Sequence, residues 1–272
     1  MLALRSVSTV SALTLAVVAA VATSASAQLR PPEVRGLRGA PFQSMNPPPD
    51  VRSFGEGPAW DPKLGVLSSG AGHVWRLDRQ AMTGTVDLPG SASKTATIPL
   101  RPMLGRVATA PEGDAAFDGL WPGDFGGNMD ASDVREGTTV YLPVFHAGAL
   151  FYFGDGHAAQ GDGEVCGSGL ETSMDVAFRF GLRKHKAIAW PRLEDAEHLM
   201  VAGSARPLTD ALRIAFVELV EWLVADYGFA KPDAYQLVSQ VAVVRVANVV
   251  DPLYTVVAKF PKRQLPPPAP AR

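Results

Sequence analysis

The β-strand character of this chain is clearest in the stretch Thr138-Thr139-Val140-Tyr141-Leu142-Pro143-Val144-Phe145. β-Branched and aromatic residues dominate this stretch over a length that is typical of one strand. A second run of the same kind, Ala149-Leu150-Phe151-Tyr152-Phe153, follows after a short break. Further short apolar runs, separated by turn residues, lie at Thr85–Leu88, Thr95–Leu100 and Ser173–Phe180. The sequence therefore predicts a region built mainly from strands.

Two helices are predicted after these strands. Residues 209–227 carry apolar side chains at the i, i+3, i+4, i+7 spacing of one buried helix face. Pro232 and Asp233 suit the first turn of a second helix over residues 232–249, because a fixed φ and a carboxylate both favour a helix start. A strand-like run follows at Tyr254–Lys259. The predicted fold class is α+β and β-rich, with β-sandwich-like sheets and two helices near the C-terminus.

The first 27 residues have the layout of a secretory signal peptide. Arg5 gives an early positive charge, an apolar run extends from Val10 to Val21, and Ala25-Ser26-Ala27 follows. The apolar run is shorter than the ~20 residues of a membrane span. We therefore expect cleavage near Ala27, export to the periplasm or the extracellular space, and no stable membrane association afterwards. An uncleaved anchor is the alternative.

Composition divides the remaining chain. Residues 28–67 are rich in Pro and Gly and indicate a loop or linker, residues 68–265 indicate the folded domain, and residues 266–272 a disordered tail. The 25 Lys and Arg residues nearly balance the 27 Asp and Glu residues, for a net charge of −2. This balance, without a basic stripe, argues against a nucleic-acid partner. Cys166 is the only cysteine, so no intramolecular disulfide can form.

Polar residues are densest in the segment Gly154-Asp155-Gly156-His157-Ala158-Ala159-Gln160-Gly161-Asp162-Gly163-Glu164. Side chains two residues apart face the same way in an extended chain, so Asp155 should lie beside His157, and Asp162 beside Glu164. Imidazole and carboxylate are ligands that suit zinc, with an open position for water. A bound divalent ion lowers the pKa of that water to roughly 7. The same residues also suit a tight surface turn or a calcium-binding loop.

A second polar cluster, Phe125-Gly126-Gly127-Asn128-Met129-Asp130, precedes this segment. Asn128 has the chemistry to orient an amide and Asp130 to complete a metal shell, although both are also ordinary loop residues. Cys166 raises the alternative of a thiol nucleophile, against the simpler interpretation of a small buried hydrophobe. The serine-hydrolase elbow, the P-loop and the dinucleotide fingerprint are absent.

Together the two clusters resemble the acetamidase/formamidase family. The matching text is Gly126–Asp130, Gly137–Phe145, Gly148–Phe151 and Gly154–Glu164, in the same order and spacing. Weaker similarity extends from about Trp75 to Leu265. The resemblance implies a hydrolase that cleaves the C–N bond of short linear amides, such as formamide or acetamide, to ammonia and a carboxylate by a metal-activated water. It also implies a β-rich homo-oligomer with a divalent metal, and the imidazole and carboxylate ligands make zinc the expected ion, with calcium as the alternative.

The family motif carries six site candidates onto this chain, Gln160 of the same segment is added to them, and we infer the role of each. They are Glu164 and Asp162 as catalytic groups, Asn128 and Gln160 as substrate-binding groups, and Asp130, Asp155 and His157 as metal ligands. We choose Glu164 as the group that carries the proton. Phe125 stands where many relatives have a histidine, and residues 28–67 show no counterpart of the family's longer N-terminal β half. The alternative function is therefore a truncated, non-catalytic relative that binds a ligand or an ion.

Overall fold

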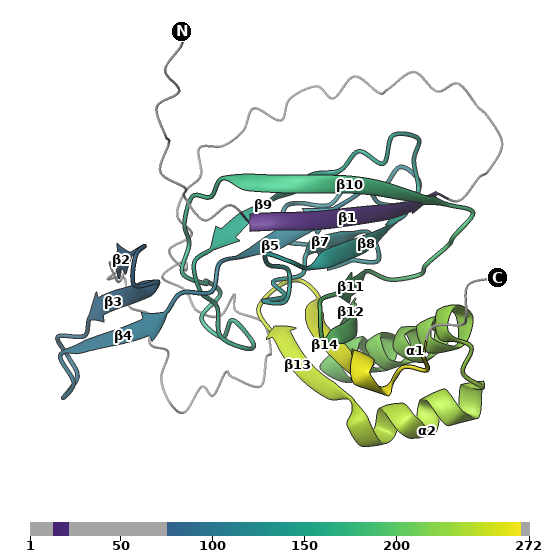
Figure 1. The fold of residues 1–272 in the computed structure, drawn as a ribbon. Coiled ribbons are helices and arrows are strands. Elements are labelled where there is room, and N and C mark those ends of the chain that lie inside the picture. The colour runs from purple at the N-terminus through teal and green to yellow at the C-terminus, as the bar shows by residue number, and fades with distance from the viewer. Residues whose placement is uncertain (1–12, 22–74, 268–272) are drawn as a thin grey trace, which may run out of the picture.

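The computed structural model describes residues 13–21 and 75–267, the first range as a backbone path only. Its largest sheet has seven strands in the order β10-β1-β8-β11-β12-β14-β13 (Figure 1). In chain order these are β1 (Leu13–Val21), β8 (Thr139–Val144), β10 (Val176–Lys184), β11 (Arg192–Glu194), β12 (His198–Ala205), β13 (Val243–Asn248) and β14 (Tyr254–Pro261). β1 runs parallel to β8 and β10, and the other neighbours in this sheet are antiparallel.

Two smaller antiparallel sheets complete the strands of the described residues. The four-stranded sheet has the order β6-β7-β5-β9. Its members are β5 (Met103–Ala108), β6 (Pro122–Gly123), β7 (Gly126–Asn128) and β9 (Tyr152–His157). The three-stranded sheet consists of β2 (Trp75–Asp78), β3 (Thr83–Asp87) and β4 (Thr95–Pro99), and it projects to one side of the molecule (Figure 1).

The seven-stranded sheet buries apolar side chains on both of its faces. On one face Leu142 of β8 and Met200 of β12 pack with Leu104 of β5, which belongs to the four-stranded sheet. On the other face Leu199 and Val201 of β12 pack against the helices. Neighbouring residues of β12 thus point into different cores, as the alternation of a strand requires. The order of layers is the four-stranded sheet, the seven-stranded sheet and the helices.

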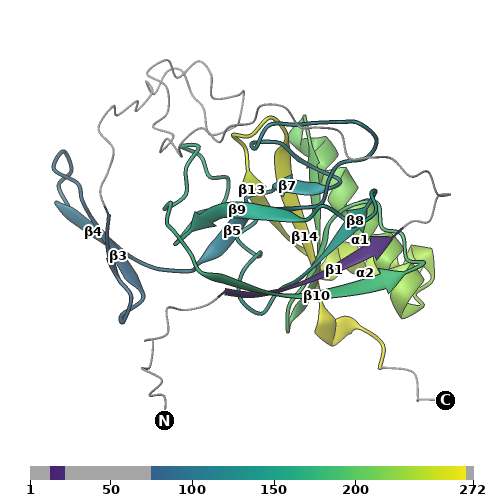
Figure 2. The same cartoon turned by 90° about the horizontal axis from the view of Figure 1, so that it is seen from above.

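Helix α1 (Leu208–Tyr227) and helix α2 (Lys231–Val241) form the third layer, and Figure 2 shows them together on the side of β14. Leu219 and Leu223 of α1 are fully buried in the core of this layer. α1 ends at Gly228, whose φ of 73° is the left-handed conformation that commonly closes a helix. Among the described residues, neither helix is long and apolar enough to span a membrane.

The predicted fold class is confirmed, with strand-rich sheets and two helices near the C-terminus. The second helix, however, ends at Val241 and not at Val249, because Val243–Asn248 forms β13 and pairs with β14. The strand expected at Ala149–Phe153 begins at Tyr152 and continues to His157, so part of the polar segment is strand.

The expectations for the chain ends overlap the described residues only slightly. Of the predicted signal peptide, residues 13–21 are described, as β1. The expected cleavage point near Ala27 lies outside the described residues, and so do the linker at 28–67 and most of the C-terminal tail.

Candidate active site

His157, the last residue of β9, lies at the centre of a group of acidic side chains. It is only 1% exposed, and its Nε2 atom lies 3.4 Å from Asp155 Oδ1 and 3.2 Å from Glu171 Oε1. Asp155 stands two residues earlier on the same strand, as the sequence predicts. Glu171 arrives on the returning chain, where Thr172 donates a backbone hydrogen bond to Gly156. Two carboxylates thus face one imidazole nitrogen.

Strand β5 brings the second polar cluster to the same place, because it pairs with β7 on one side and β9 on the other. The backbone N–H of Asp130, just beyond β7, donates to the carbonyl of Gly105 in β5. A Cβ atom on Gly105 would overlap both Asp130 Oδ1 and Asp155 Oδ2. The missing side chain at this glycine therefore lets two carboxylates approach each other over β5.

Two further acids, Glu164 and Asp251, reach the cluster from other segments. Gly163 exchanges backbone hydrogen bonds with Val246 and Val249, so the turn before Glu164 is held against β13. Glu164 is 7% exposed and Asp251, in the connection from β13 to β14, is also buried. Asp251 Oδ2 accepts a 3.0 Å hydrogen bond from Asn128 Nδ2. Neither Asp251 nor Glu171 belongs to a motif in the sequence, and only the folded chain brings Glu171 to His157 and Asp251 to Asn128.

Three of these acids have an unusual backbone conformation. Asp130, Asp155 and Glu164 have φ values of 46°, 62° and 47°. This left-handed region costs L-residues roughly 1–2 kcal/mol each, and such residues concentrate at functional sites. Tertiary contacts therefore hold the three carboxylates in place against the preference of the backbone.

Burial and mutual repulsion shift the pKa values of this cluster. Burial, followed by the charge of Asp130, raises the pKa of Glu164 to about 9. Burial also raises the pKa of Asp130, with repulsion from Asp251 adding to it. The pKa of Asp251 rises to about 7 because of burial, although the hydrogen bonds from Asn128 and Asp130 oppose the rise.

The histidine and its neighbour shift toward their charged forms. Burial opposes the charge on His157, yet hydrogen bonds to Asp155 and Glu171 raise its pKa to about 11. For Asp155 burial is likewise outweighed, by the hydrogen bond and charge of His157 and by Arg106, so its pKa is lowered. The cluster thus favours a positive charge at its centre.

These donors fit a divalent cation. One group of possible ligands is Asp130, Asp155 and His157, and a second is His157, Glu164 and Glu171; within each group the ligand atoms lie within 4.8 Å of one another. Asp130 Oδ1 is buried and has no hydrogen-bond partner among the described residues. A buried carboxylate oxygen without a donor is costly unless a cation satisfies it. Carboxylate and imidazole suit zinc, and a set richer in oxygen suits calcium.

The two predicted substrate-binding amides have protein partners for both ends. Asn128 Nδ2 donates to Asp130 at 2.6 Å, while its Oδ1 accepts from Arg106 at 2.8 Å. Gln160 lies 2.8 Å from His157 Nδ1 through its Oε1 atom. Both amides therefore belong to the cluster and brace its charged groups.

The two remaining candidates of the polar segment lie away from the cluster. The carboxylate of Asp162 is 56% exposed, and its Oδ1 atom lies 3.0 Å from Arg245 Nε. Cys166 is exposed, and its thiol donates to the Ser168 carbonyl at 3.4 Å. Neither side chain belongs to the two possible ligand groups around His157.

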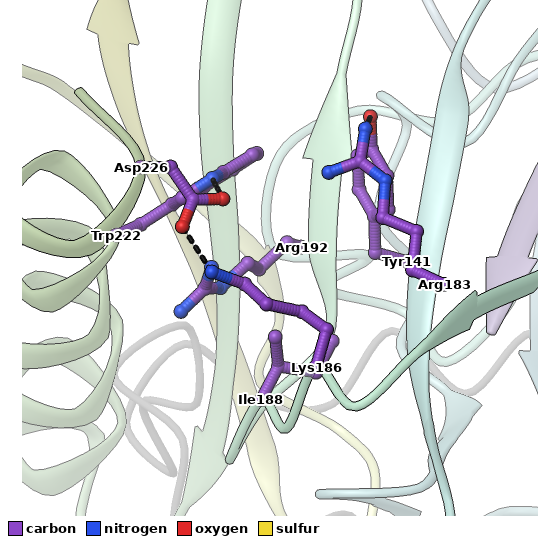
Figure 3. A pocket seen from close by; sticks show the side chains of 7 residues that line it. All are labelled: Tyr141, Arg183, Lys186, Ile188, Arg192, Trp222 and Asp226. Atoms are coloured by element: carbon purple, nitrogen blue, oxygen red, sulfur yellow. Dashed lines mark hydrogen bonds and ion pairs between the residues drawn. The ribbon is translucent and has the colours of Figure 1, made fainter. Parts of the chain in front are cut away.

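A separate small pocket lies between the seven-stranded sheet and α1 (Figure 3). It is lined by Tyr141, Arg183, Lys186, Ile188, Arg192, Trp222 and Asp226. Its volume of about 10 Å³ is room for roughly one water molecule. Lys186 is paired with Asp226 and Arg192 with Glu218, and Arg183 donates a hydrogen bond to the Tyr141 hydroxyl. We therefore assign the site to the cluster around His157 and not to this pocket.

The cluster lies within the part of the chain that is similar to known proteins. The model of the Acetamidase/Formamidase family matches residues 104–263, which include every residue of the cluster. An acetamidase structure from Yersinia enterocolitica is 40% identical over 71% of this chain and 56% of its own, with a TM-score of 0.60. An acetamidase from Bacillus halodurans is 31% identical over 66% of this chain and 59% of its own, with a TM-score of 0.55.

A curated formamidase from Methylophilus methylotrophus is 34% identical over 87 residues, which are 30% of this chain and 21% of that protein. The chain thus spans just over half the length of the two solved relatives and about a fifth of the formamidase.

Proposed function

Because the chain belongs to the acetamidase/formamidase family, we propose that it hydrolyses the C–N bond of short linear amides to ammonia and a carboxylate. Formamide and acetamide are the expected types of substrate. The convergence of Asp130, Asp155 and Glu164 on His157, within the residues that match the family, carries this proposal.

An amide needs several kinds of help to be hydrolysed. Its carbonyl is a poor electrophile and its amine a poor leaving group, so carbonyl polarisation, an attacking water and a proton donor must act together. Asp130, Asp155 and His157 would hold a divalent cation, zinc or calcium. When bound, such an ion supplies Lewis-acid polarisation and a water pKa that zinc lowers to roughly 7.

The chain's own proton carrier in this proposal is Glu164. Its carboxyl is buried beside His157, and its burial favours the protonated form, which can donate to a departing amine. Once deprotonated, the same carboxylate can accept a proton from water. Of the two carboxylates predicted as catalytic, Glu164 reaches the cluster, whereas Asp162 pairs with Arg245 near the surface.

Ammonia release tests this function directly. Formamide, acetamide and propionamide would be offered to the protein as isolated, after complete chelation, and after reloading with zinc or calcium. Release that falls on chelation and returns on reloading supports the proposal. Activity that survives complete removal of metal would contradict the metal mechanism. Cation binding without ammonia release from any amide would favour the non-catalytic, ion-binding relative.

We also propose that the protein is exported and forms a homo-oligomer. The layout of residues 1–27 supports export. An exposed aromatic group on β9 and β10, which includes Phe153 and Phe180, supports association, because such apolar patches commonly mark interfaces. N-terminal sequencing of the secreted or periplasmic protein and light scattering would test the two points separately.

A further inference from the structure

The side chain of Gln160 is held in a single orientation by the main chain. Its Nε2 atom donates to the carbonyl of Asp130 at 2.6 Å and to the carbonyl of Ala247 at 3.1 Å. Carbonyl oxygens only accept hydrogen bonds, so a reversed amide would set Oε1 against two other acceptors. The amide oxygen of Gln160 must therefore face His157, where it lies 2.8 Å from Nδ1.

This orientation decides which nitrogen of His157 keeps its proton when the ring is neutral. Because Oε1 of Gln160 can only accept, Nδ1 must be the donor. The other ring nitrogen, Nε2, then faces the carboxylates of Asp155 and Glu171. The ring also packs directly on Gly169, where a Cβ atom would overlap its Nδ1 edge. The imidazole is thus fixed in both its position and its hydrogen bonding.

We propose that Gln160 is a positioning residue that keeps the proton on Nδ1 of His157 and so presents Nε2 to the cation. When the ring is neutral, its Nε2 lone pair faces the carboxylates of Asp155 and Glu171, and a cation held by Asp130, Asp155 and His157 removes that repulsion. Hydrogen-bond partners of this kind fix the ring orientation and tautomer of metal-binding histidines. The part of this inference that concerns the cation rests on the proposed function, whereas the state of Nδ1 does not.

Two variants distinguish positioning of the His157 ring from bracing of the Asp130 and Ala247 carbonyls. Gln160→Met keeps a similar length but offers no acceptor to Nδ1. Gln160→Glu restores the acceptor but cannot donate to the carbonyls of Asp130 and Ala247. We expect Gln160→Met to bind cadmium-113 roughly 10–100-fold more weakly than the unmodified protein. Gln160→Glu should recover much of that loss. If bracing the two carbonyls were the whole role, Gln160→Glu would be at least as damaging as Gln160→Met, and the proposal would be overturned.

Nitrogen-15 NMR of histidine-labelled protein reads the ring directly. In the cadmium-loaded protein we expect coupling of the metal to Nε2 and a retained proton on Nδ1. Coupling of the metal to Nδ1 would overturn the positioning role. Equal binding of cadmium through Nε2 in the unmodified protein, Gln160→Met and Gln160→Glu would overturn it as well. In metal-free protein the Nδ1 proton should exchange slowly and become labile in Gln160→Met. If that difference appears while no cadmium binds, Gln160 retains its role and the cation of the proposed function fails.

Discussion

The side-chain amide of Asn128 donates a hydrogen bond to Asp130 and approaches a second buried acid with the same nitrogen. The distances are 2.6 Å to Asp130 Oδ2 and 3.0 Å to Asp251 Oδ2. The amide oxygen accepts from Arg106, which fixes the direction of the amide. A single neutral side chain thus donates to two buried carboxylates. Without this donor the two carboxylates would repel each other with no hydrogen bond from Asn128 to offset the repulsion.

We predict that Asn128→Asp destabilises the protein. The new carboxylate cannot donate, so Asp130 and Asp251 lose their shared donor, and the unfolding free energy should fall by about 1–3 kcal/mol. Urea denaturation of the metal-free protein measures this change. Unchanged stability together with a raised KM for amides would show instead that the amide of Asn128 serves the substrate.

Gly105→Ala should disable the site without removing any ligand. Its Cβ atom would overlap the carboxylates of Asp130 and Asp155, so zinc affinity and turnover should fall roughly tenfold or more. Gly154→Ala is the matched control, because Gly154 lies on the neighbouring strand with open space around its Cβ position. Isothermal titration with zinc compares the two variants. Equal affinities would contradict the convergence of the carboxylates over β5.

His157→Ala and Glu164→Gln should each abolish turnover. The first removes a ligand and the second removes the proton carrier, and loss of a general acid or base typically costs about 100-fold or more. Glu136→Gln makes the same chemical change as Glu164→Gln at an exposed position and should keep normal ammonia release. A loss in Asp162→Asn as large as that in Glu164→Gln would contradict the assignment of Glu164 as the carrier.

The metal-free protein should lose stability as the pH rises. The pKa of His157 is raised from 6.5 to about 11 and that of Glu164 from 4.5 to about 9, so the folded state binds these protons more tightly than the unfolded state. Their contribution is fully present below the unfolded pKa values and is lost as the pH rises through the folded values. Tm measured in chelator from about pH 6 to about pH 10 should therefore fall, less steeply in His157→Ala. A Tm that rises over this range would contradict the prediction.

Cys166→Ala should leave ammonia release within about twofold of normal, because a thiol nucleophile must reach the substrate. The side chain of Cys166 is exposed and donates to the carbonyl of Ser168 within its own loop. Kinetics with acetamide, together with the metal content of the variant, check this point. A large loss of rate with metal retained would support the thiol mechanism.

The parts of the fold that local composition determines could be predicted from the sequence. β8 and α1 combine strong residue preferences with a clear pattern, and both form close to their expected bounds. β12 carries no such pattern, because six successive residues are buried between two layers. The apolar residues of Val243–Asn248 are compatible with a helix or with a strand, and pairing with β14 makes the segment a strand.

In the site, too, the features set by local sequence could be predicted and those set by tertiary contacts could not. The two-residue period of a strand correctly places Asp155 beside His157. That period fails for Asp162 and Glu164, because Gly163 has a φ of 85° and turns the chain between them. Glu171 and Asp251 could not be predicted, since only the folded backbone brings them to His157 and Asn128.

The left-handed backbone of Asp130, Asp155 and Glu164 sets stability and chemistry against each other. Glycine adopts this conformation without strain, so replacing Asp130 or Glu164 would relax the backbone by about 1 kcal/mol and relieve the crowding of buried charge. Selection for thermal resistance alone would therefore favour the loss of these acids. The most heat-tolerant variants of this protein would then be those that lack the acids on which the proposed activity depends.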